Sequence, residues 1–349
     1  MHKYHIGWDI GGAHVKAACL NSAGQILHVR QLYCPLWKGV NYLHQAVAAY
    51  LAELPAAEYA HYITMTGELA DCFADRAEGV SAIISVMQQH LLGQDVYIYA
   101  SRYGFLKPAD VTSAQHMAIA SLNWLASASL AARSGQTGLF VDTGSTTTDI
   151  LLIQAGQLQV QGYSDYQRLV SGELLYTGVI RSAVMAIAQQ AEFNGQTMGL
   201  MAEYFATMAD VYRVSGDLHE AHDQADTADG AEKTPQASAR RLSRLTGYEF
   251  KPDDWLLWQA FADTLKNRQK ALIWEACAKQ LQRLDGPAPV VLIGAGVGRF
   301  LLRELAAEQG MAYLDFNELV GNAATQAAEM DAGDCAPAVA VAYLGSGFC

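Results

Sequence analysis

The stretch GWDIGGAHVKAA, residues 7–18, decides the fold because a related stretch, VDTGSTTTDI, returns at residues 141–150. In each stretch an apolar run ends in an aspartate, Asp9 or Asp142, and glycines and a second apolar run follow it. An Ala-Gly-Gln corner then follows each aspartate at nearly the same spacing. This repetition predicts one β-hairpin built twice, at corresponding points of two related domains.

The order of the predicted elements repeats as well. Runs typical of strands alternate with runs typical of helices in both halves, which predicts an α/β fold. We expect an N-terminal domain over residues 1–133 and a C-terminal domain over residues 134–349, the latter with an insertion at about 195–254. Helices are expected at 113–132 and 172–190, and alanine-rich helices towards the C-terminus.

The segment 215–240 interrupts this pattern. It is rich in Asp, Ala and His and has no clear apolar period. One interpretation is a solvated surface insertion. The other is a mobile loop that closes over a cleft between the two domains, with few apolar anchors of its own. A metal at His219 and His222 would need a helix that the pattern does not define.

Composition limits the classes of partner. The 349 residues are 51% hydrophobic and 17% charged, which predicts a folded chain, and the net charge of −12 disfavours nucleic acid and anionic membranes as partners. The six cysteines form no CxxC pair, which indicates reduced thiols. No signal peptide and no apolar run of about 18 residues is expected, which predicts a cytoplasmic protein acting on small molecules. Homo-oligomerisation stays open.

The two aspartate turns have the chemistry of a phosphate site. Glycines let backbone N–H groups approach phosphate oxygens closely, and an aspartate holds Mg²⁺ that in turn binds the phosphates. Asp9 and Asp142 are therefore the candidate Mg²⁺ ligands. The alternative for either turn alone is an ordinary tight turn. The candidate phosphate cradle comprises Gly11, Gly12, Gly144, Ser145, Thr146 and Thr147.

Other residues near these turns carry two interpretations each. Lys16 either reaches a phosphate oxygen or is an exposed strand residue, and His14 is either a phosphate donor or a packed strand residue. The late turn IGAGVGR, residues 293–299, follows a strand and opens a helix. Its Gly294 and Gly296 either form the edge of a nucleotide or substrate site, or let helix and strand pack closely.

Several motifs resemble known proteins. DIGG, DTGSTTTD and the late GAG are similar to the phosphate and adenosine segments of the acetate kinase, sugar kinase, Hsp70 and actin superfamily. Four motifs resemble a narrower family, the hydantoinase A/oxoprolinase-like proteins of the tetrahydromethanopterin-linked C1 pathway, whose archaeal members include furan-methanamine synthases of methanofuran biosynthesis. These motifs are TMTGELADCFADRAEGV (64–80), VDTGSTTTDI (141–150), SGELLYTGVIR (171–181) and ADGAEKT (228–234).

The resemblance implies two duplicated ribonuclease H-like domains facing across a cleft. It also implies a transferase rather than a kinase. Such a synthase joins an (aminomethyl)furan-methyl diphosphate to the phenol oxygen of a γ-glutamyl-tyramine-type acceptor and releases diphosphate. Mg²⁺, bound by Asp9 and Asp142, is the expected cofactor, and a role for Asp142 in catalysis follows from it.

A phenol attacks more readily with a base beside it, because its unperturbed pKa is near 10. Glu68 is the first candidate base and Glu173 the second, although either could instead cap a helix N-terminus. Asp229 and Lys233, with Asp226, are candidates to close over the diphosphate. Candidates for a glutamyl carboxylate are Arg76, Arg102 and Arg181.

Two alternatives stay open. Sugar kinases usually have Thr or Ser after the first glycine pair, whereas Ala13 and His14 stand here, which weakens the case for ATP. An ATP-dependent small-molecule kinase or a hydantoinase-type hydrolase is nevertheless the second hypothesis. The third is a non-enzymatic, nucleotide-responsive assembly protein.

Overall fold

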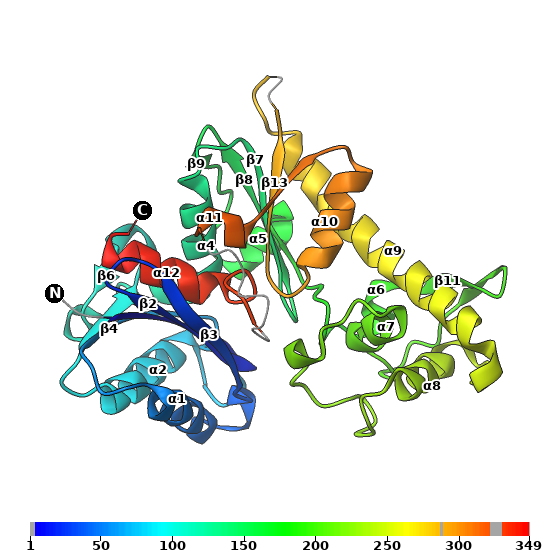
Figure 1. Cartoon of the computed structure of the whole chain (residues 1–349), viewed down its shortest axis with the longest axis horizontal. Helices are drawn as coiled ribbons and strands as arrows, with labels where there is room; N and C mark the ends of the chain where they lie inside the picture. The colour runs from blue at the N-terminus through cyan, green and yellow to red at the C-terminus, as the bar shows by residue number, and fades with distance from the viewer. Residues whose placement is uncertain (1–3, 287–288, 322–329, 349) are drawn as a thin grey trace. The chain divides into compact units, whose positions relative to one another are not determined.

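A computed structural model describes residues 4–286, 289–321 and 330–348. The chain forms two compact units (Figure 1). Unit 1 comprises Met1–Gln136, Ile153–Asp165 and Asp315–Cys349, and unit 2 comprises Thr137–Leu152 and Tyr166–Leu314. The sequence placed the boundary close by, at 133/134, but assigned every later residue to the second domain.

Unit 1 is built on one sheet. The strand order is β3-β2-β1-β4-β5-β6, in which β1 pairs antiparallel with β2 and parallel with β4. Short apolar strands with β-branched and aromatic residues favour this pairing. The strands are β1 (Tyr4–Ile10), β2 (His14–Asn21), β3 (Ile26–Tyr33), β4 (Tyr59–Met65), β5 (Asp95–Tyr99) and β6 (Phe105–Leu106).

Helices cover both faces of this sheet. Alternate β1 residues, Ile6, Trp8 and Ile10, belong to one core cluster with α1 (Asn41–Glu53) and α2 (Arg76–His90). The intervening residues face the opposite side, where α12 (Ala336–Ser346) and α4 (Asn123–Ala132) pack on each other. A side chain at Gly7 would collide with the backbone of Ala338, so this glycine lets α12 lie directly on the sheet. The C-terminal segment therefore belongs to unit 1.

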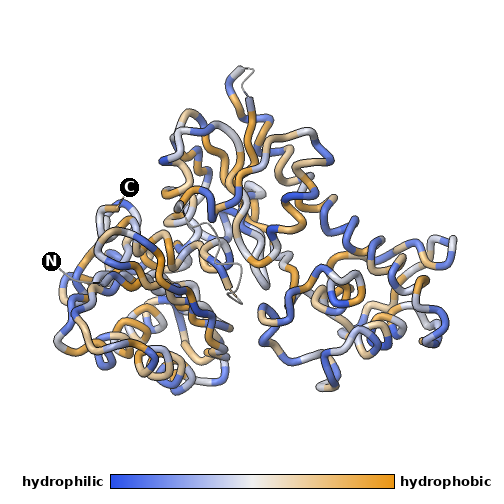
Figure 2. Tube along the Cα trace, in the orientation of Figure 1, coloured by the Kyte–Doolittle hydropathy of each residue, from blue (hydrophilic) through white to orange (hydrophobic). Residues whose placement is uncertain are grey.

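Unit 2 repeats the same strand order. Its sheet runs β10-β8-β7-β13-β14, with β7 parallel to β13, as β1 is to β4. This match confirms the α/β class and the duplicated ribonuclease H-like arrangement, and Figure 2 shows hydrophobic residues along the strands of both sheets. The strands on this path are β7 (Gly138–Thr143), β8 (Thr148–Gln154), β10 (Leu174–Leu175), β13 (Val291–Ala295) and β14 (Ala312–Asp315). The short β9 (Gln157–Leu158), which belongs to a unit 1 segment, pairs with β8.

The other elements of unit 2 include the insertion. A separate hairpin of β11 (Gln190–Phe193) and β12 (Gln196–Gly199) lies against the long α9 (Trp255–Leu281). The remaining helices are α5 (Asp165–Ser171, whose first residue ends a unit 1 segment), α6 (Val184–Ile187), α7 (Met208–Ser215), α8 (Pro235–Thr246) and α10 (Arg299–Glu308). Unit 2 also contains the 3₁₀ turns η4 (Glu220–His222) and η5 (Pro252–Asp254). Unit 1 contains α3 (His116–Ile119), α11 (Phe316–Leu319) and the 3₁₀ turns η1 (Leu36–Lys38), η2 (Ser101–Tyr103) and η3 (Pro108–Asp110).

Two predicted helices are wrong. The helix expected at 113–132 is divided into α3 and α4, because Ser121 between them adopts a left-handed backbone with φ of +54°. The helix expected at 172–190 does not form, since Gly172 takes φ of +80° and the following residues pair with β8. Alanine-rich helices were expected towards the C-terminus, and residues 322–329 of that region lie outside the described residues. Within the described part, no helix is both long and apolar enough to cross a membrane.

Candidate functional site

The two aspartate turns have the same backbone hydrogen bond. In unit 1 the Gly11 N–H donates to the His14 carbonyl at 2.9 Å, and in unit 2 the Gly144 N–H donates to the Thr147 carbonyl at 2.9 Å. Each aspartate is the last residue but one of a central strand of its sheet, just before the turn. The duplication predicted from the sequence is therefore present at the level of individual hydrogen bonds.

In unit 1 polar groups surround Asp9, which is only 6% exposed. The Asn123 side-chain amide lies 3.3 and 3.4 Å from its two carboxylate oxygens. Lys16 on β2 and Thr64 on β4 are its cross-strand neighbours. The Lys16 ammonium donates to the Asp334 carbonyl at 2.6 Å, so it is held by the C-terminal segment. The buried Thr64 hydroxyl makes no hydrogen bond within the described residues.

In unit 2 the late glycine turn packs directly against Asp142, which is 8% exposed. A side chain at Gly296, whose φ is +85°, would collide with the Asp142 carboxylate and the Thr143 carbonyl. The Gly298 N–H donates to that carbonyl at 2.8 Å. Gly294 lies within β13, where the absent side chain makes room for the Tyr313 hydroxyl. Both predicted glycines thus serve close packing, and a ligand at this edge stays a prediction.

The hydroxyl-rich part of the second turn is backed by the segment 178–181. The Gly144 carbonyl accepts from Val179 N–H at 3.0 Å, and the Ser145 carbonyl accepts from Arg181 N–H at 2.8 Å. In a planar trans peptide the following N–H points opposite to the carbonyl. The N–H groups of Ser145 and Thr146 therefore point away from the backing segment, and neither has an acceptor among the described residues. Adjacent N–H groups of this kind form an anion-binding concavity.

The side chains of this turn add further donors. The Ser145 and Thr146 hydroxyl oxygens lie 3.4 Å apart, and the Arg181 guanidinium lies 3.5 Å from the Thr146 hydroxyl. Thr147 is half-buried. Arg181, which the sequence offered as a carboxylate partner, thus lies beside the candidate phosphate cradle instead.

Glu68 is a fully buried acid directly after β4. One carboxylate oxygen accepts a hydrogen bond from the Ser121 hydroxyl at 2.6 Å, while the other has no partner among the described residues. Burial raises the pKa of Glu68, and the Ser121 hydrogen bond and the Arg76 charge, 4.0 Å away, lower that pKa by less. A carboxyl with a raised pKa binds a proton more readily than an exposed glutamate does, which suits a proton acceptor.

Ser121 is itself held in a strained position. Its φ of +54° is rare for a residue other than glycine, and the Trp124 indole N–H fixes its carbonyl at 2.9 Å. Backbone strain of this kind clusters at functional sites. Ser121 could not be predicted from the sequence, because it lies inside an alanine-rich run that has the pattern of one helix. Arg76, beside Glu68, is paired with Asp165 at 2.5 Å.

Glu173, the second candidate base, is fully buried near β10. It accepts from the Ser171 hydroxyl at 3.0 Å and lies 3.7 Å from the Arg283 guanidinium. Its backbone carbonyl accepts from the Arg168 side chain at 3.0 Å. No helix begins at this point, so the alternative role as a helix cap does not apply.

The segment 215–240 is fastened by a buried network of ion pairs. Arg213 pairs with Asp223 at 2.5 Å, and Arg241 pairs with Asp210 at 2.7 Å and with Asp229 at 3.1 Å. All of these side chains except Asp229 are almost fully buried. The sequence showed few apolar anchors here, and the structure supplies charged ones. Ligand-dependent ordering of this segment stays a prediction.

The predicted ligands of this segment take part in the network. Lys233 donates to the Asp223 carbonyl at 2.7 Å. Burial alone would raise the pKa of Asp229, but the Ala231 N–H and the Arg241 and Arg244 charges together lower it. The rings of His219 and His222 lie 5.0 Å apart, and the described residues contain no group of three or more His, Cys, Asp or Glu side chains placed to hold a metal.

The donor set of the turns nevertheless fits Mg²⁺. This ion usually takes only one or two protein carboxylates and completes its shell with water and substrate phosphates. Asp9 and Asp142 each offer one carboxylate beside a glycine turn, and the glycine at 296 leaves the space in which Asp142 sits. The relative placement of the two turns, and hence a shared ion, stays a prediction.

This chain is similar in sequence to known proteins. The family described as hydantoinase/oxoprolinase matches residues 60–327. The chain is 31% identical over 297 residues to a (4-{4-[2-(gamma-L-glutamylamino)ethyl]phenoxymethyl}furan-2-yl)methanamine synthase of Methanocaldococcus jannaschii, covering 83% of this chain and 86% of that protein. A protein of the same name from Methanococcus vannielii is 33% identical over 107 residues, which are 31% of this chain and 48% of that protein.

Solved structures were also compared. A ROK family glucokinase of Streptomyces griseus, in complex with glucose and AMPPNP, gives a TM-score of 0.49 at 16% identity and covers 98% of both chains. Component A of the (R)-2-hydroxyglutaryl-CoA dehydratase of Acidaminococcus fermentans gives a TM-score of 0.47 at 10% identity and covers 99% of both chains.

Proposed function

The chain belongs to the hydantoinase/oxoprolinase family, and on that premise we propose that it is a synthase of methanofuran-like cofactor biosynthesis. The relatives named as synthases support an enzyme. The proposed reaction joins an (aminomethyl)furan-methyl diphosphate to the phenol of a γ-glutamyl-tyramine-type acceptor. The phenol oxygen forms a bond to the furan-methyl carbon, the carbon–oxygen bond to diphosphate breaks, and diphosphate leaves with the electron pair.

The observation that carries this proposal is the second aspartate turn. It presents the N–H groups of Ser145 and Thr146 together with two hydroxyls and the nearby Arg181 guanidinium. Such donors suit the developing charge on a departing diphosphate, because fixed N–H groups stabilise an anion without reorganising. The name of the archaeal relative contains a phenoxymethyl-furan group, whose ether bond is the bond that this reaction makes.

Asp9 and Asp142 are the residues that would hold Mg²⁺. When bound, the ion neutralises phosphate charge as a Lewis acid. Other residues of the chain hold these two carboxylates in place. Asn123 contacts the Asp9 carboxylate, and the turn at Gly296 confines that of Asp142. The Lys16 ammonium donates to the Asp334 carbonyl, so this scheme assigns it no phosphate contact.

The phenol proton passes to Glu68 through Ser121. A direct transfer is excluded in the described conformation because both Glu68 oxygens are buried. The Ser121 hydroxyl already donates to Glu68, so it can accept the phenol proton as its own proton moves to the carboxylate. The proton ends on Glu68 and returns to water after the product leaves. The raised pKa of Glu68 favours its role as the acceptor.

The decisive experiment supplies the two substrates with Mg²⁺ and measures ether product by mass spectrometry and diphosphate by a coupled assay. We expect one diphosphate for each ether formed, with no requirement for ATP. Calorimetry with Mg·ATP is the companion measurement. Tight ATP binding with hydrolysis, and no ether, would overturn this function in favour of a kinase or a nucleotide-responsive assembly protein.

A further inference from the structure

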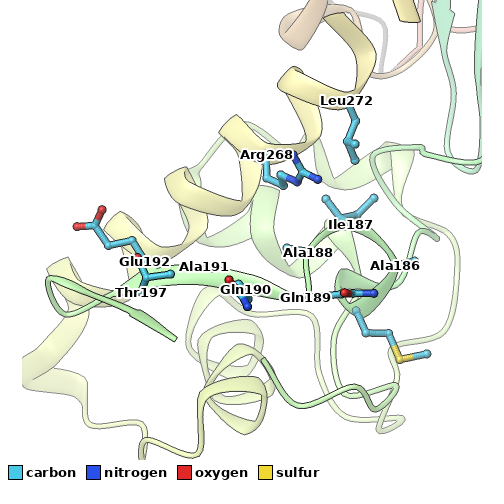
Figure 3. Close-up of a pocket in the computed structure, with 11 residues that line it drawn as sticks. Ala186, Ile187, Ala188, Gln189, Gln190, Ala191, Glu192, Thr197, Arg268 and Leu272 are labelled. Carbon is cyan, nitrogen blue, oxygen red and sulfur yellow. The ribbon is translucent and has the colours of Figure 1, made fainter. Parts of the chain in front are cut away.

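Unit 2 contains an open groove of about 820 Å³ that none of the predicted site residues lines. One wall is the segment from α6 into β11, and the other is α9. Figure 3 shows Arg268 and Leu272 extending from α9 towards Ile187, with Glu192 and Thr197 at the other end of the groove. The volume lies within the usual range for small-molecule sites.

The charged residue Arg268 of the groove differs from the nearby lysines of α9 in its partners. The neighbouring lysines on α9 are used in ion pairs, with Lys266 and Lys270 both bound to Glu304. Arg268 on the same helix is exposed and lines the groove, and it takes part in none of the hydrogen bonds or ion pairs found among the described residues. Its guanidinium is therefore available, beside a side wall of Ile187 and Leu272.

The remaining lining residues complement an anion with an aliphatic chain. Gln189 and Gln190 supply side-chain amides, and Met185 supplies a flexible apolar surface. A guanidinium binds a carboxylate through two parallel hydrogen bonds, which makes a carboxylate the best-matched ligand. Glu192, at the far end, disfavours a second negative charge there.

We propose that this groove binds the carboxylate end of the acceptor substrate, with Arg268 on the carboxylate and the Ile187–Leu272 surface along the aliphatic chain. This proposal rests on the proposed function, because the γ-glutamylamino group in the name of the archaeal relative supplies such a carboxylate. It assigns a residue to substrate selection that the sequence motifs do not contain.

The groove is connected to the second aspartate turn through α9. Gln269, next to Arg268, donates to the Thr177 hydroxyl at 2.7 Å and to the Gly178 carbonyl at 3.0 Å. Gly178 packs on the backbone of Ser145 and Thr146, where any side chain would collide. One face of α9 thus supports the candidate phosphate cradle while the adjacent residue faces the groove.

The test compares γ-glutamyl-tyramine with tyramine, which lacks the carboxylate, for wild type, Arg268→Ala and Arg268→Lys. We expect Arg268→Ala to raise KM for γ-glutamyl-tyramine about 10- to 100-fold with kcat little changed, the usual effect of losing a charge-assisted hydrogen bond. KM for tyramine should not move, and the lysine variant should recover part of the loss. Arg240→Ala, which changes an exposed arginine of unit 2 outside the groove, is the matched control.

Calorimetry with γ-glutamyl-tyramine and each variant separates the two proposals. Ether formation by the wild type with an unchanged KM in Arg268→Ala would overturn the groove and leave the function standing. Binding that depends on Arg268 without any ether would support the groove and overturn the function. An equal rise in KM for both acceptors would also count against the groove, because tyramine has no carboxylate to lose.

Discussion

The two aspartate turns share a backbone but differ in what surrounds them. Both close with the same 2.9 Å hydrogen bond. Asp9 is held by an amide, and a buried acid follows the neighbouring strand β4, whereas Asp142 is enclosed by a glycine turn and followed by hydroxyl residues. Where Glu68 follows β4 in unit 1, only Gly296, Val297 and Gly298 follow β13 in unit 2. The two copies therefore share the backbone of the turn but differ in the side chains around it.

The residue opposite each aspartate on the neighbouring strand shows the same separation. In unit 1 this position is Lys16, which donates to Asp334 at 2.6 Å. The corresponding position in unit 2 is Asp149, which pairs with Arg168 at 2.7 Å. The two positions carry opposite charges, and the Asp149 carboxylate has an ion-pair partner whereas the Lys16 ammonium is bonded to an uncharged backbone carbonyl. A phosphate contact of Lys16 and phosphate binding by the turns both stay predictions.

The largest effect should come from changing Glu68, which has no acidic counterpart after β13 in unit 2. Glu68→Gln should slow ether formation by about 10²–10⁴-fold, the usual contribution of a positioned acid–base group, and leave diphosphate affinity intact. Ser121→Ala should slow it similarly if Ser121 carries the proton. High pH should partly rescue both variants, because more of the phenol ionises unaided. Steady-state kinetics from pH 6 to 10 checks this.

A matched control exists for the serine variant. Ser127 on α4 is also buried, and its hydroxyl has no partner among the described residues, so Ser127→Ala should keep wild-type turnover. If Glu68→Gln instead gave normal turnover per folded molecule, the base would have to be sought at Glu173 or Asp226.

The next effect concerns the two aspartates. Asp142→Asn and Asp9→Asn should each lower Mg²⁺-dependent turnover by about 10²–10³-fold, since each loses a charge and a metal ligand. If the two carboxylates act on one ion, the double variant should be little worse than either single variant. Titration of activity against Mg²⁺ measures this, with Asp110→Asn as the control. Full activity in Asp9→Asn would show that Asp9 is only structural.

A smaller effect distinguishes the two turns by stability. A side chain on Gly11 would lie 2.9 Å from the His14 carbonyl, whereas one on Gly144 would lie 3.6 Å from the Thr147 carbonyl, an ordinary contact. Gly11→Ala should therefore cost about 1–3 kcal/mol of unfolding free energy, and Gly144→Ala should stay within about 0.5 kcal/mol of wild type. Urea unfolding followed by circular dichroism checks the pair. Equal losses would mean that the turns are packed alike.

The smallest effect is the pH dependence of the stability of Glu68→Gln. Because burial raises the folded-state pKa of Glu68 above its unfolded value, its contribution to stability is fully present at low pH and is lost as the pH rises through the folded-state pKa. The side chain of the glutamine variant does not ionise. The melting temperature of this variant should therefore rise relative to that of the wild type as the pH increases from 4 to 8. A constant difference across this range would contradict the raised pKa.

Much of the fold follows from local sequence. The apolar runs of β1, β2, β7 and β8 alternate with turn residues, and their spacing repeats, so strand type and duplication are visible in one chain. Helix continuity was less predictable. Ser121 breaks an alanine-rich run with good helix propensity, because its left-handed backbone is held by Trp124 and bonded to Glu68, contacts that no local pattern encodes.

The candidate site divides in the same way. Asp9, Asp142 and their glycines were predictable because a turn needs those residue types at fixed offsets. Asn123, Ser121 and Arg268 were not, since each acts through a partner distant in the chain or through a groove between separate segments. The ion pairs that hold the segment 215–240 could not be predicted either, because the sequence does not distinguish Arg213 and Arg241 from surface residues until their carboxylate partners are placed.

The sequence by itself determined the duplicated hairpins, the two aspartate turns and the family, because these depend on short-range spacing and on residue types with restricted backbone geometry. Tertiary structure alone decided that the C-terminal helix returns to unit 1, where the missing side chain of Gly7 admits the backbone of Ala338. It also decided that Glu68 is an acid with a raised pKa, because desolvation depends on what packs around a carboxyl and not on its neighbours in the chain.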